Sequence, residues 1–125
     1  MKELVPFLNS TVNKDLRPLS FCDSGYANGY VAVPPEHPLF GKHYDKVDDM
    51  IDINSSLTFS DTSDSCCNWD DIETINDNSN TIPLGWWVFG FDTIHLGYTL
   101  KTWPKERCIE ETLRLKEQLE ELWNR

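Results

Sequence analysis

The sequence predicts an α+β fold in which a small, mostly antiparallel sheet packs against a long C-terminal amphipathic helix. Three observations support this prediction. Residues 104–124 carry helical periodicity, residues 84–91 have the composition of a strand that is apolar on both faces, and shorter β-branched segments precede that strand. The 125 residues suffice for one compact domain and are too few for two, so we expect a single domain over residues 1–125.

The C-terminal segment, residues 104–124, has the clearest pattern, with no glycine and no interior proline. Cys108, Leu115 and Leu122 recur every seven residues, and neighbouring apolar side chains widen this stripe. Pro104 suits the first helical turn, where its missing N–H costs nothing. Such a stripe can pack on the chain's own sheet or form the seam of a homodimer. Because it is wider than a strict coiled-coil seam, packing on the sheet is the favoured arrangement.

The strand character lies before this helix. Residues 84–91 have apolar side chains on both faces, which predicts a central strand that is covered on both sides. Its expected neighbours are three shorter segments, residues 29–33, 50–60 and 94–101, the last as a hairpin partner.

Two segments lack a clear pattern. Residues 61–81 are polar, acidic and rich in turn residues, which predicts a long loop. Loops of this length are uncommon and often functional. Residues 1–28 show weak periodicity and predict an irregular N-terminal segment.

The net charge of −10 argues against direct binding to a nucleic-acid backbone and against an anionic membrane surface. The charge is local, because residues 44–77 contain ten acidic residues and one lysine. A local acidic field can attract a positively charged groove on another protein. The candidates for such a partner surface are four aspartates of this segment: Asp61, Asp64, Asp70 and Asp71.

The cellular compartment is predicted from what the sequence lacks. No apolar run is long enough for a signal peptide or a membrane span, so we expect a cytoplasmic protein. The four cysteines are then expected to be thiols. Their spacing does not match a zinc ribbon, and no cofactor is expected.

A ligand pocket is the next prediction, because aromatic rings beside a few polar groups are typical of small-molecule sites. A nucleobase can stack on such a ring. The candidate ligand-binding residues surround the predicted central strand: Tyr44, Trp86, Trp87, Asp92 and His95. The alternative is that the rings form the core and that Asp92 and His95 only hydrogen-bond to each other.

A metal site and catalysis are less clearly indicated. Two histidine–aspartate pairs provide the candidate metal ligands, together with one further histidine: His37, His43, Asp45, Asp92 and His95. The sequence contains no nucleophile elbow, phosphate-binding loop or dinucleotide fingerprint. The acidic surroundings of Cys66 and Cys67 oppose thiolate formation. The sequence therefore favours a non-enzymatic function and leaves a small metal-assisted hydrolase as an alternative.

Three stretches carry a family resemblance: GYVAVPPEHPLFGKHYDKV (29–47), LTFS (57–60) and WWVFGFDTIH (86–95). There the chain resembles a group of small, uncharacterised bacteriophage and prophage proteins, over about residues 29–123. Relatives often have His-Gly-Gly where this chain has residues 54–56, Asn-Ser-Ser. A metal ligand at that histidine would therefore be missing here.

The resemblance implies a function by association. Small acidic phage proteins often inhibit host defence, so the expected function is inhibition of a host defence protein by direct binding, as anti-CRISPR proteins do. The first alternative is binding or sequestration of a nucleotide-like immune signal. The second is a small metal-assisted hydrolase.

Overall fold

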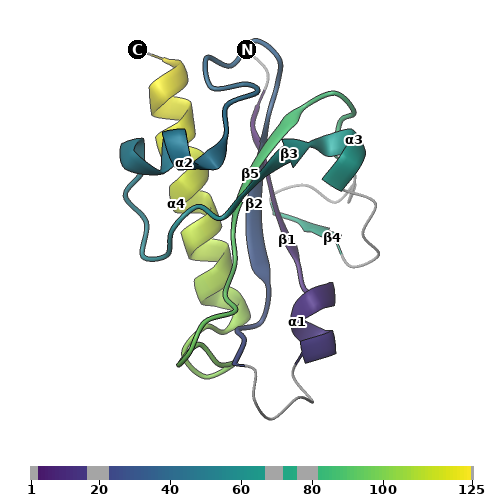
Figure 1. Ribbon diagram of the computed structural model, residues 1–125, viewed down its shortest axis with the longest axis vertical. Coiled ribbons are helices and arrows are strands. Elements are labelled where there is room, and N and C mark those ends of the chain that lie inside the picture. The colour runs from purple at the N-terminus through teal and green to yellow at the C-terminus, as the bar shows by residue number, and fades with distance from the viewer. Residues whose placement is uncertain (1–2, 17–22, 67–71, 76–81, 125) are drawn as a thin grey trace.

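The computed structural model describes residues 3–16, 23–66, 72–75 and 82–124. Within them, a five-stranded antiparallel sheet carries one long helix, α4 (Lys105–Trp123), along one face (Figure 1). This confirms the predicted α+β fold. No helix in these residues is long and apolar enough to cross a membrane.

The strand order across the sheet is β3-β5-β2-β1-β4, and each neighbouring pair is antiparallel. The five strands are β1 (Val5–Asn9), β2 (Asn28–Val33), β3 (Phe59–Thr62), β4 (Ile72–Thr74) and β5 (Trp87–Phe91). The other helical segments are short: α1 (Thr11–Leu16), α2 (Tyr44–Val47), the 3₁₀ helix η1 (Asp48–Met50) and α3 (Ser63–Cys66).

Strand β5 is buried on both faces, as its sequence predicts. Phe89 and Phe91 lie on the α4 side of the sheet, whereas Val88 belongs to a second apolar cluster on the opposite side. Alternate residues of a strand point to opposite faces. An apolar residue at nearly every position therefore requires cover on both sides.

Helix α4 packs on strands β1 and β2 through one stripe of side chains. Its buried residues are Cys108, Glu111, Thr112, Leu115 and Leu119. The approach to the sheet is close at Gly29, where an added Cβ would lie 2.2 Å from Thr112 Oγ1. Glycine at this position therefore permits the helix to reach the sheet. The predicted packing of the C-terminal helix on the chain's own sheet is confirmed.

A row of aromatic rings crosses the opposite face. Tyr30 stacks on Phe7 with ring centroids 5.2 Å apart and meets Phe59 edge-on at 5.5 Å. The Tyr30 ring lies over Gly90, whose added Cβ would be 2.3 Å from that ring. Cross-strand aromatic pairs of this kind stabilise a sheet beyond the area they bury.

Four sequence expectations differ from the structure. Residues 61–81, expected to form one long loop, contain the end of β3, α3 and β4 in their described part. The N-terminal segment contains β1 and α1, although its periodicity predicts no element. Of residues 50–60, only the end belongs to a strand, β3. Residues 94–101 form turns in place of a hairpin strand, because Gly97 adopts φ +88° and the Tyr98 N–H bonds back to the His95 carbonyl at 2.9 Å.

Candidate functional site

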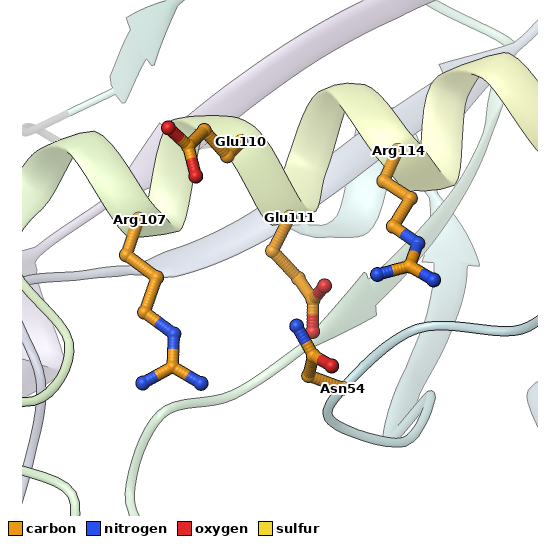
Figure 2. Close-up of a pocket in the computed structure, with 5 residues that line it drawn as sticks. All are labelled: Asn54, Arg107, Glu110, Glu111 and Arg114. Atoms are coloured by element: carbon orange, nitrogen blue, oxygen red, sulfur yellow. The ribbon is translucent and has the colours of Figure 1, made fainter.

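A shallow pocket of about 220 Å³ opens beside the middle of α4. Four of its five lining residues come from the helix and one from the segment before β3: Arg107, Glu110, Glu111, Arg114 and Asn54 (Figure 2). Pockets for drug-sized ligands measure roughly 300–1,000 Å³, so this one suits a smaller molecule.

Glu111 is the unusual residue of this pocket. It lies three residues after Cys108 and four before Leu115, within the buried stripe of α4, and only 3% of its surface is exposed. Its Oε2 accepts hydrogen bonds from the Ser55 backbone N–H at 2.8 Å and the Ser55 hydroxyl at 3.1 Å. Its Oε1 has no partner among the described residues. A buried acceptor left unsatisfied is costly, so this oxygen suggests a donor from outside the chain.

Arg107 forms one side of the pocket, and its guanidinium is held in place by two contacts. It lies 3.9 Å from the centroid of the buried Trp103 ring, and its Nη1 donates to the Thr102 carbonyl at 2.6 Å. Stacking of a guanidinium on an aromatic ring leaves its edge donors available. The remaining N–H groups of Arg107 are therefore presented from a fixed position.

Arg114 forms the other side and is held less firmly. Its Nη2 lies 3.8 Å from Asp52 Oδ2, and about half of its side chain is exposed. Arg107, Glu111 and Arg114 project from α4 toward the side on which Asn54 lies (Figure 2). Their spacing explains this, because positions four before and three after Glu111 share its helix face. Among the described residues, neither arginine forms an ion pair with Glu111.

The segment opposite the helix is fixed by Gln118. The Asp52 backbone N–H donates to Gln118 Oε1 at 2.7 Å, and Gln118 Nε2 donates to the Asp52 carbonyl at 2.8 Å. A second tie follows five residues later, where the Leu57 N–H donates to Asp48 Oδ1 at 2.8 Å. These bonds hold Asn54 and Ser55 against α4 and so shape the pocket.

The chemistry of the lining favours binding. Two guanidinium groups can donate to an anion, a buried carboxylate oxygen can accept from a ligand donor, and the Asn54 amide can do either. No histidine or cysteine is among the lining residues. The arrangement can orient a small polar molecule, and its potential bases are the carboxylates of Glu110 and Glu111.

Asp92 and His95, at the end of β5, form a local pair. His95 Nε2 lies 2.9 Å from Asp92 Oδ1, which also accepts from the Ile94 N–H at 3.1 Å. The His95 ring meets Tyr98 edge-on at 5.0 Å. The pair is partly exposed and does not line the Glu111 pocket.

The aromatic candidates are distributed over the two faces of the sheet. Trp87 packs on the α4 side and donates from Nε1 to the Lys42 carbonyl at 2.8 Å, whereas Trp86 packs against the second cluster. The Tyr44 ring lies beside His43, with centroids 4.3 Å apart. Asp92 lies about 20 Å farther along the extended chain than Trp86, at roughly 3.3 Å per residue. The structure therefore does not gather the five predicted ligand-binding residues around one cavity.

The candidate metal ligands are also dispersed. His43 and Asp45 form an exposed pair, with Nδ1 and Oδ1 2.8 Å apart. His37 is buried, and both of its ring nitrogens have protein partners: Nδ1 accepts from the Leu39 N–H at 3.0 Å and Nε2 lies 2.8 Å from the Leu119 carbonyl. The described part of the chain contains no group of three or more acidic, histidine or cysteine side chains that could hold a metal.

The predicted partner surface is described only in part. Asp61 lies in β3 and accepts from the Thr62 N–H at 2.7 Å. Asp64 lies in α3, where its Oδ1 accepts from the Gly85 N–H at 2.7 Å. Asp70 and Asp71 lie outside the described residues. Asp64 therefore helps to fold the turn before β5 as well as carrying charge.

Cys108 lies in the core between α4 and the sheet. It is a free cysteine, fully buried, and burial raises the pKa of its thiol. Its Sγ lies 3.5 Å from the Ala27 carbonyl, so it packs between helix and sheet.

The sequence reasoning did not identify Glu111, although a signal is present. The apolar stripe of α4 passes through position 111, and a charged residue in such a stripe is almost never fully buried unless it is paired.

Comparisons with protein families, curated proteins and solved structures found no match to this chain.

Proposed function

We propose that the protein captures a small anionic ligand in the Glu111 pocket and does not transform it. The single observation that carries this proposal is Glu111 Oε1, a buried carboxylate oxygen that has no partner among the described residues and belongs to a pocket-lining side chain. A buried acceptor without a hydrogen-bond partner lowers the stability of a fold. Such a cost is commonly found at functional sites.

The two arginines support an anionic ligand. Arg107 and Arg114 flank Glu111 without pairing with it, so their donors are available on the pocket side. Guanidinium groups bind phosphate and carboxylate through paired N–H donors, and hydrogen bonds to charged groups are about twice as strong as neutral ones. The lining groups that could act as a base are the carboxylates of Glu110 and Glu111, and Glu111 is engaged by Ser55, so capture is the function that we propose.

Thermal unfolding against a panel of small anions, nucleotides and divalent metals tests this proposal. A ligand at about one hundred times its dissociation constant should stabilise the fold by roughly 2.7 kcal/mol, a shift of several degrees in Tm. Arg114→Gln should abolish the shift. Lys116→Gln is the matched control, because it removes one positive charge from the same helix but does not line the pocket. The proposal is contradicted if no compound raises Tm, or if the compound that does so raises the Tm of Arg114→Gln by the same amount.

A second candidate, in line with the phage resemblance, is inhibition of a host defence protein by contact in the host cytoplasm. One observation favours it: the side chains of Asp45 and Asp52 are 67% and 94% exposed within the acidic segment. Exposed carboxylates can approach a basic groove, and such binding weakens with salt. The test is loss of inhibition when Asp61, Asp64, Asp70 and Asp71 are changed to asparagine. Retained inhibition excludes these four aspartates as the partner surface.

A further inference from the structure

The identity of the ligand's second group can be argued from Glu111. Its Oε2 already accepts two hydrogen bonds from Ser55, whereas Oε1 has none. A carboxylate oxygen accepts and cannot donate. A ligand that satisfies Oε1 must therefore bring a hydrogen-bond donor, and the common donors on small metabolites are the ammonium group and the hydroxyl group.

The charges around Glu111 distinguish these two donors. Arg107 lies on one side of its carboxylate and Arg114 on the other (Figure 2). An ammonium group at Oε1 would approach both guanidinium groups, and like charges in a partly desolvated site repel. A hydroxyl group donates to the carboxylate without adding positive charge. Glu110, the other carboxylate of the lining, points away from these three side chains (Figure 2), so the surroundings of Oε1 favour a neutral donor.

The same two arginines determine where the anionic group binds. Arg107 is held by Trp103 and Thr102, so its free donors are fixed in direction. Arg114 has only a 3.8 Å contact with the highly exposed Asp52, and this weak pair is easily exchanged for a ligand anion. The anion thus has one rigid and one adaptable donor group within reach.

We infer that the ligand is a small anionic polyol, which donates a hydroxyl to Glu111 Oε1 and accepts from Arg107 and Arg114 with a phosphate or carboxylate. This inference rests on the proposed function of the pocket and names its ligand class. A volume of about 220 Å³ suits a sugar phosphate or a hydroxy acid. The ribose phosphate part of a nucleotide belongs to the same class.

Matched pairs of probes test the inference on the unaltered protein by titration calorimetry. Glycerol 3-phosphate and propyl phosphate have the same anion and similar size but differ in hydroxyl groups. Glycerate and propionate differ in the same way among carboxylates, so the two pairs distinguish a phosphate from a carboxylate ligand. We expect the hydroxylated member of at least one pair to bind about tenfold tighter or more, the effect of one hydrogen bond to a charged group.

Two variants then assign the contacts. Glu111→Gln keeps an oxygen that can accept from Ser55 but places an NH2 group, which donates, where Oε1 accepts. It should reduce binding of the hydroxylated probe about tenfold and leave the other member of the pair unchanged. Arg114→Gln should weaken both members equally. Glu117→Gln is the control for Glu111→Gln, because Glu117 is an exposed glutamate of the same helix that does not line the pocket.

The outcomes separate this inference from the proposed function. Equal binding of both members of each pair, with Arg114→Gln still weakening them, overturns the hydroxyl contact and leaves an anion site. Tighter binding of ethanolamine phosphate than of glycerol 3-phosphate overturns the choice of a neutral donor. If no probe binds and the wider anion panel is also flat, the inference and the proposed function both fail.

Discussion

The backbone N–H of Ser55 donates to Glu111 Oε2 over 2.8 Å, and this bond joins the segment before β3 to the centre of α4. One oxygen of this carboxylate therefore helps to hold the fold together, and the other is buried without a partner among the described residues, on a side chain that lines the pocket. A buried polar group with only part of its hydrogen bonds made contributes less to stability than an apolar contact of the same size. The proposed ligand explains the presence of a glutamate at position 111 better than a contribution to folding does.

Glu111→Gln should for this reason leave the free energy of unfolding within about 1 kcal/mol of the original protein, or raise it. The amide oxygen can still accept from Ser55, and no desolvated charge remains. Urea unfolding at neutral pH measures the difference, with Glu110→Gln as the exposed control. A loss of about 3 kcal/mol or more would instead mean that the charged hydrogen bonds from Ser55 to Glu111 are essential for folding.

Gln118 should control the order of the opposite pocket wall. Its side chain makes two bonds to the Asp52 backbone, and each is worth about 0.5–1.5 kcal/mol net. Gln118→Ala should therefore lower stability by roughly 1–3 kcal/mol and speed hydrogen exchange at the Asp52 amide. Glu117→Ala, an exposed change on the same helix, is the control. Unchanged exchange at Asp52 in Gln118→Ala would show that other contacts hold this segment.

Much of the fold could be predicted because its signals are local. The stripe of α4 and the two apolar faces of β5 follow directly from residue periodicity. Strand β1 was not predicted, because its five residues include Pro6 and its pairing partners, β2 and β4, come later in the chain. Short strands depend on long-range pairing, which a local pattern does not contain.

The candidate site was harder to predict, because it depends on one residue whose environment is set by tertiary packing. Glu111 resembles the other glutamates of an acidic helix until its place in the buried stripe is considered. Ser55 and Gln118 are separated from their partners by more than fifty residues, so their hydrogen bonds have no signature in the sequence. The aromatic residues, by contrast, are prominent in the sequence, but the structure uses most of them in two clusters on opposite faces of the sheet.

His37 predicts a loss of stability on mild acidification. Burial lowers the pKa of His37 below its ordinary value of 6.5, and the bond to the Leu119 carbonyl opposes this only in part. Below pH 6.5 the unfolded chain therefore binds more protons at this residue than the folded chain does. The free energy of unfolding changes with pH in proportion to the difference in bound protons between the unfolded and folded states. It should therefore fall as the pH decreases below 6.5.

Urea unfolding between about pH 7.5 and pH 5.5 measures this effect, because a histidine titrates within that interval. His37→Asn keeps an acceptor near the Leu39 N–H and should have a flatter pH dependence than the original protein. His43→Asn, at an exposed histidine, should retain the original dependence. If the free energy of unfolding depends on pH equally in His37→Asn and the original protein, other titratable groups cause the loss of stability.

Tyr30 predicts a second pH effect, at the alkaline end. Burial, with a smaller contribution from Asp92, raises the pKa of Tyr30 from 10.0 to about 12, although a hydrogen bond from Asn28 opposes the shift. Because the folded-state pKa is the higher one, the stabilisation is complete below pH 10 and is lost as the pH rises toward 12. The full size of this pH-dependent contribution to the free energy of unfolding is on the order of 3 kcal/mol. The difference in phenolate absorbance between the original protein and Tyr30→Phe should give a midpoint well above 10. A midpoint near 10 would show that water reaches the Tyr30 hydroxyl on this face of the sheet.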